Sequence, residues 1–205
     1  VGALVALTER DPRVNLFVRH RVEETGLRDV LLTGKVYEAV RRRIKGRPDS
    51  YDAVVLDAPP TGRITRFLNV HEAVAGLARI GPIHSQADSI MTLLRSSRTV
   101  VHLTSLLQEM PVTETLEAIT ELEPTGITVG TIIGTMVTPT PLSPEQIVRL
   151  AAEPPTFDLT GVPAETSAGL SREYAGTLAA LAAEQQNYER LAEAGIRMVE
   201  LPQDP

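Results

Sequence analysis

Apolar and polar residues follow two distinct patterns along this chain of 205 residues. Short, almost uninterrupted apolar runs occupy residues 51–57, 98–103 and 127–133, and a weaker run occupies residues 196–201. Runs of this length are typical of strands that are buried on both faces of a parallel sheet. We therefore expect four strands of a mainly parallel sheet in these places.

Between these runs, apolar residues recur every three or four positions, which is the spacing of a helix with one buried face. The spacing predicts helices over residues 27–44, 64–78, 112–122 and 171–194. A further helix should begin after Ser143, because a capping serine is followed by a proline and, three residues on, by Gln146. Alternating strands and helices predict a doubly wound, mainly parallel α/β sheet, which binds ligands beyond the carboxyl ends of its strands.

The length of the chain suits a single domain spanning residues 1–205. Residues 1–25 form a poorly defined N-terminal segment, in which a short apolar start gives way to a charged stretch. The first residue, Val1, is not an initiator methionine. We therefore interpret the chain as one domain that is incomplete at its N-terminus.

Composition narrows the classes of function. The net charge of −6 argues against a broad nucleic-acid-binding face, since such a face must neutralise phosphates. The chain has no cysteine, so it can form no disulfide and no thiolate site for zinc. No apolar run reaches the roughly 18 residues that a membrane span requires, which predicts a cytoplasmic protein without a membrane span.

The stretch Asp57-Ala-Pro-Pro-Thr-Gly-Arg63 follows the first apolar run and carries the clearest chemical signal. An acidic residue that ends a buried strand can orient a magnesium ion or its waters in a nucleotide hydrolase. A glycine such as Gly62 lets backbone amides approach a terminal phosphate closely. The competing interpretation is structural: Asp57 caps the next helix, and the two prolines form a rigid turn.

The stretch from Asp57 to Gly62 closely resembles the Asp-Thr-Ala-Pro-Thr-Gly-His signature of the arsenite/anion-transporting ATPase family, which is related to the ATPases that target tail-anchored proteins. The similarity extends over residues 26–134, where it resembles an actinobacterial branch of the family, and weakly over residues 195–202. It implies that ATP and magnesium are cofactors and that Asp57 is the catalytic residue, which positions the metal through water. It also implies nucleotide-binding roles for Pro60, Thr61, Gly62, Arg63, Thr135, Leu201 and Pro202.

The sequence departs from the family pattern in several places. The Gly-rich phosphate loop and the first switch loop are missing, and Thr33-Gly-Lys-Val36 lacks the spacing and the hydroxyl residue of a phosphate loop. Thr135 stands where relatives usually carry an asparagine for the adenine, and Arg63 replaces the commoner histidine. Without cysteine, the thiol site for arsenite and the zinc-bound dimer of the targeting branch are excluded.

The resemblance implies a fold of the P-loop NTPase type that lacks its N-terminal phosphate-loop unit. It also implies an ATPase subunit whose magnesium-dependent hydrolysis drives a conformational switch, with this chain inactive by itself. A homodimer, or a heterodimer with a family paralogue, is expected across the nucleotides. The alternatives are a non-catalytic partner subunit and an α/β interaction protein that binds no nucleotide. Without a phosphate-loop strand, the sheet is also expected to expose unpaired ladder groups.

Overall fold

Six strands form one sheet in the computed structural model, which describes residues 2–8, 14–19, 33–41, 51, 53–69 and 82–203. The strands are β1 (Gly2–Thr8), β2 (Val14–Arg19), β3 (Ala53–Ala58), β4 (Thr99–Leu106), β5 (Val129–Val137) and β6 (Arg197–Pro202). Their order across the sheet is β2-β3-β1-β4-β5-β6. The four strands predicted from apolar runs are confirmed, each with its ends shifted by a few residues.

Five of the six described strands run in the same direction. β2 pairs in parallel with β3, and β4, β5 and β6 pair in parallel with one another. β1 is antiparallel to both of its neighbours, β3 and β4, with Ala3 opposite Ala58 and Leu103. The prediction of an α/β fold with a mainly parallel sheet flanked by helices is thus confirmed.

The N-terminal segment differs from its expectation. Residues 1–25 show no clear sequence pattern, yet they supply both β1 and β2. Because β1 fills the position between β3 and β4, the expected exposure of ladder groups there is wrong. Strand pairing with distant segments, rather than a local pattern, determines this part of the sheet.

The helices are a segment over residues 33–41, α2 (Thr61–Leu68), α4 (Pro82–Leu94), α5 (Glu109–Leu122), α6 (Pro144–Ala152) and α7 (Ala164–Ala192), with a 3-10 turn at Glu123–Thr125. The predictions for α5 and α6 are confirmed. α7 begins at Ala164, directly after Pro163, rather than near Ser171. α4 was not predicted, although Ala87, Ile90, Met91 and Leu94 have helical spacing. The helix predicted over residues 64–78 corresponds to α2, which begins three residues earlier and ends at Leu68, so the prediction is wrong at Asn69. Residues 70–78 of that prediction, and residues 27–32 and 42–44 of the helix predicted over residues 27–44, lie outside the described part of the chain.

The main core joins one face of the sheet to the helices. Leu56 and Val101 lie at the same position of the register, each paired with Val5, so the two buried side chains share one face of the sheet. Buried residues of α2, α4, α5 and the segment 33–41 form one apolar cluster with that face. On β4, by contrast, residues of the other face, such as Val100 and His102, are only half-buried.

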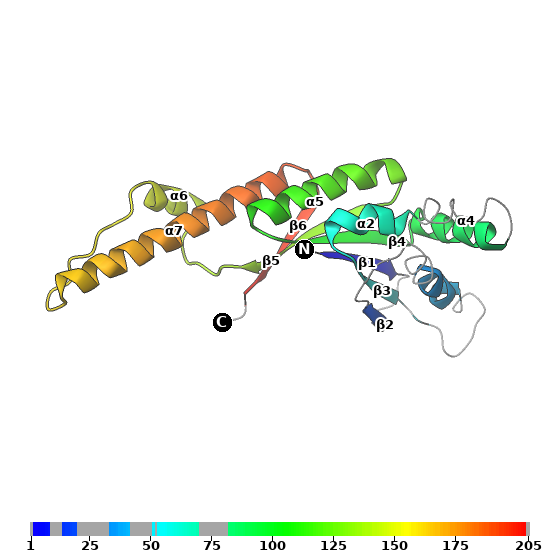
Figure 1. Ribbon diagram of the computed structural model, residues 1–205, viewed down its shortest axis with the longest axis horizontal. Coiled ribbons are helices and arrows are strands. Elements are labelled where there is room, and N and C mark those ends of the chain that lie inside the picture. The colour runs from blue at the N-terminus through cyan, green and yellow to red at the C-terminus, as the bar shows by residue number, and fades with distance from the viewer. Residues whose placement is uncertain are drawn as a thin grey trace.

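A second, smaller cluster anchors the C-terminal half of α7. Leu191 packs with Leu107, Val112 and Ile132, which joins α7 to the end of β4, to α5 and to the interior of β5. Figure 1 shows α6 and the first half of α7 extending beyond the sheet, side by side. Among the described residues, no helix combines the length and the apolar character needed to cross a membrane.

Candidate functional site

Asp57 lies where the sequence predicts it. It is the second-to-last residue of β3, an interior strand paired with β2 on one side and β1 on the other. Its side chain is half-buried. The carboxyl ends of β3, β4, β5 and β6 point toward the same edge of the sheet, so Asp57 lies at the edge where α/β proteins bind ligands.

The residues after Asp57 form a short turn and then enter α2. The helix begins at Thr61, and its N-cap residue is Pro60, whose side chain forms no capping hydrogen bond. The competing interpretation, in which Asp57 caps this helix, stays a prediction. The backbone N–H of Arg63 donates to the carbonyl of Pro60 at 2.9 Å, and the Arg63 side chain is exposed. The side chain of Thr61 lies outside the described part.

Gly62 is exposed in the first turn of α2. A methyl group at this position would meet no described atom within 4 Å beyond the helix itself. Glycine is costly in a helix, by roughly 1 kcal/mol relative to alanine. Since packing among the described residues does not require a glycine here, the open space beside the α2 N-terminus is available to a ligand.

The predicted base-binding residues come together on β5 and β6. Thr135 lies opposite Leu201, and Val137 lies opposite Pro202. The Thr135 hydroxyl donates to the carbonyl of Ser105 at 3.3 Å, and Leu201 is 50% exposed. Two strands separate this group from Asp57, so the two groups are roughly 14 Å apart across the sheet. They share an edge without touching, as the two ends of an extended nucleotide site would.

A cavity of about 950 Å³ opens at the end of β5, between the start of α5 and one side of α7; we call it the α5 cavity. Its lining is rich in side chains that can donate or accept hydrogen bonds, among them Gln108, Thr135, Asn187, Arg190 and Gln203. Apart from Thr135, these residues were not predicted from the sequence. The sequence feature that could have indicated this cavity was Asn187, a polar residue on the face of α7 that also carries the buried residues Leu178, Leu181 and Leu191.

A hydrogen-bond network fixes the wall of the α5 cavity. The Asn187 amide donates through Nδ2 to the carbonyl of Leu107 at 3.3 Å, and this asparagine is only 8% exposed. Arg190 donates through Nη1 to Oδ1 of Asn187 at 3.2 Å and through Nη2 to the Thr113 hydroxyl at 3.3 Å. α7 therefore holds the turn between β4 and α5 in place by polar contacts as well as by packing.

The described residues supply only part of a magnesium site. No three His, Cys, Asp or Glu side chains of the described part lie close enough together to hold a metal ion. Magnesium usually takes one or two carboxylates, with water and substrate phosphates completing its six oxygens. Asp57 can supply one such carboxylate, directly or through water, and it lines neither the α5 cavity nor the second cavity described below.

No protein-family model matches the chain. The chain is 49% identical over 126 residues to ATPase BagA of Mycobacterium tuberculosis (strain ATCC 25618 / H37Rv), and equally to the protein named "Putative ATPase Mb3704" of Mycobacterium bovis. The aligned residues are 62% of this chain and 37% of each relative. The chain is thus similar to proteins named as ATPases and spans little more than a third of their length.

Proposed function

We propose that this chain forms part of the nucleotide site of an ATPase of the arsenite/anion-transporting family. The observation that carries the proposal is the placement of Asp57 and the Pro60–Arg63 turn on the same sheet edge as Thr135, Leu201 and Pro202. Similarity to proteins named as ATPases supports the ATPase part of this proposal. A cytoplasmic location and assembly with a second family member belong to this proposal.

In this proposal the two ends of the edge have separate tasks. Asp57 holds water molecules of the magnesium ion, and the amides at the start of α2 face the terminal phosphate beside Gly62. Bound magnesium would supply positive charge to the phosphates. Thr135, Leu201 and Pro202, together with the α5 cavity, form the end that receives the base. Gln108 and Gln203 there offer both donors and acceptors to it.

A second candidate is a non-catalytic subunit, or an α/β interaction protein that binds no nucleotide. Two observations favour it. The sequence contains no Gly-rich phosphate loop. In the structure, antiparallel β1 occupies the position between β3 and β4. The two candidates are distinguished by measuring whether the protein that carries this chain hydrolyses ATP.

The decisive experiment is Asp57→Asn in the protein expressed from its whole gene. We expect magnesium-dependent ATP hydrolysis to fall roughly a hundredfold, the size of effect typical when one electrostatic group of an active site is lost, while circular dichroism stays unchanged. Asp158→Asn is the matched control, because Asp158 is exposed in the loop before α7 and far from β3 along the chain. Equal turnover in the two variants would remove Asp57 from the mechanism.

A further inference from the structure

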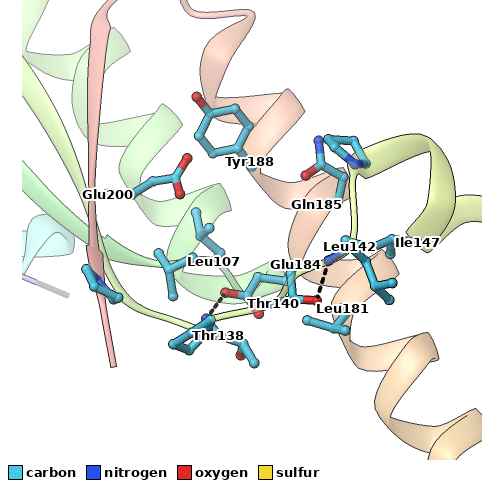
Figure 2. Close-up of a pocket in the computed structure, with 14 residues that line it drawn as sticks. Leu107, Thr138, Thr140, Leu142, Ile147, Leu181, Glu184, Gln185, Tyr188 and Glu200 are labelled. Atoms are coloured by element: carbon cyan, nitrogen blue, oxygen red, sulfur yellow. Dashed lines mark hydrogen bonds between the residues drawn. The ribbon is translucent and has the colours of Figure 1, made fainter. Parts of the chain in front are cut away.

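A second cavity lies between the ends of β5 and β6 and the α6–α7 pair (Figure 2). Its volume is about 410 Å³, within the range of roughly 300–1,000 Å³ typical of small-molecule sites. We call it the α6 cavity. It contains none of the residues from Asp57 to Arg63.

The wall of the α6 cavity is apolar over about half of its surface. Ile147 and Leu181 are buried, and they face the cavity from α6 and α7 respectively. Leu107, Val137 and Leu142 add aliphatic surface, and the ring of Tyr188 adds an aromatic face. Binding a hydrocarbon or aromatic group against these side chains is favourable, because it removes apolar surface from water.

Two carboxylates also line this cavity. Glu200 extends from β6 and Glu184 from α7 into the space between these elements (Figure 2). Glu184 accepts the backbone N–H of Thr138 through Oε1 at 2.8 Å. The lining contains no lysine, arginine or histidine, and neither carboxylate forms a salt bridge with any described residue. The cavity therefore combines apolar surface with two carboxylates whose charge no lysine, arginine or histidine of the described residues balances.

We propose that the α6 cavity binds a small organic cation: an ammonium group attached to an aromatic or aliphatic body. The body would pack against Leu181 and Tyr188, and the ammonium group would donate charge-assisted hydrogen bonds to Glu200 and Glu184. The same carboxylates disfavour an anion, so the site differs in chemistry from one that binds nucleotide phosphates. The α6 cavity shares Leu107, Thr138 and Glu184 with the α5 cavity and Pro202 with the proposed base end, but it uses none of the residues from Asp57 to Arg63.

The test compares three probes of one shape and different charge: 2-phenylethylammonium, neutral 2-phenylethanol and anionic phenylacetate. Binding is followed in the isotope-labelled 205-residue chain by amide chemical shifts of Thr138, Leu142 and Tyr188. We expect the ammonium probe to bind at least about tenfold more tightly than the alcohol, which is the scale of a hydrogen bond to a charged group. Phenylacetate should bind most weakly. Equal affinities for the three probes would overturn the proposal.

Glu200→Gln tests the carboxylate directly. This side chain is exposed near the end of an edge strand, so the substitution should leave folding intact. The ammonium probe should lose about tenfold in affinity, while 2-phenylethanol binds as before. Glu173→Gln is the control, since Glu173 is exposed on α7 outside the cavity. An unchanged ammonium affinity in Glu200→Gln, or shifts that map away from the cavity, would contradict the proposal.

Discussion

At the scale of single residues, Gly62 links conformation to the proposed function. It is exposed in the first turn of α2 and has open space around it. Gly62→Ala should raise the free energy of unfolding by about 0.5–1 kcal/mol, because alanine restricts the unfolded chain and suits a helix. The added methyl group would occupy the space proposed for the terminal phosphate, so hydrolysis by the protein from the whole gene should fall. Thermal unfolding and turnover, measured on the same samples, check both effects.

Gly130 supplies the matched comparison for that substitution. A methyl group at Gly130 would lie 2.4 Å from Cγ1 of Val100 and 2.9 Å from Cε1 of His102. The His102 ring is held in place, since its Nδ1 accepts the backbone N–H of Thr131 at 3.0 Å. Gly130→Ala should therefore lower the free energy of unfolding by about 1–3 kcal/mol, as overpacking does. A gain in both stability and turnover for Gly62→Ala would show that its open space is not reserved for a ligand.

At the scale of elements, the start of α6 is a self-contained cap. Ser143 accepts the Gln146 N–H at 3.3 Å, and the Gln146 side chain accepts the Ser143 N–H at 2.8 Å. The Ser143 hydroxyl also donates to Glu145 at 2.7 Å, and this bond is the main reason why the pKa of the Glu145 carboxyl lies below its ordinary value. A backbone hydrogen bond of Glu145 lowers the pKa further.

Ser143→Ala should therefore raise the pKa of Glu145 toward its ordinary value, which an NMR titration of the carboxyl carbon measures. The sign of the pH dependence follows from the lowered pKa. In the native protein the stabilisation is present above the ordinary carboxyl pKa and is lost as pH falls through the lowered one. The substitution should reduce that dependence, and the part due to the backbone hydrogen bond of Glu145 should remain. A Glu145 pKa that does not move would mean that the hydroxyl is not its main partner.

The elements also show what a sequence can predict. The α6 cap was predictable because all of its contacts lie within four residues of Ser143. The strand that ends in Asp57 was predictable because it is a continuous apolar run. β1 was not, since its pairing with β3 and β4 depends on residues far along the chain. The two cavities were not predictable either, because they form only when α7 packs beside the ends of β4, β5 and β6.

At the scale of the whole molecule, the carboxyl edge of the sheet is unevenly equipped for a nucleotide. Its β5–β6 end has a lined cavity and a hydrogen-bond network that fixes the cavity wall. Its β3 end has one carboxylate and the N-terminus of the short helix α2. The sequence contains no Gly-rich phosphate loop, and β1 runs antiparallel beside Asp57. The proposed base end therefore has more of the groups that a nucleotide site needs than the proposed phosphate end.

This imbalance predicts how the 205-residue chain responds to adenosine and Mg-ATP. A phosphate loop contributes a row of backbone amides and a lysine, which neutralise most of the charge on the phosphates. Without these groups, Asp57 presents a negative charge to a negative ligand, so the triphosphate should add little affinity. We expect calorimetry to show weak binding of both ligands, with dissociation constants within about tenfold of each other, and no hydrolysis by the chain alone. Micromolar binding of Mg-ATP, with adenosine far weaker, would contradict this prediction and require a phosphate site elsewhere in the molecule.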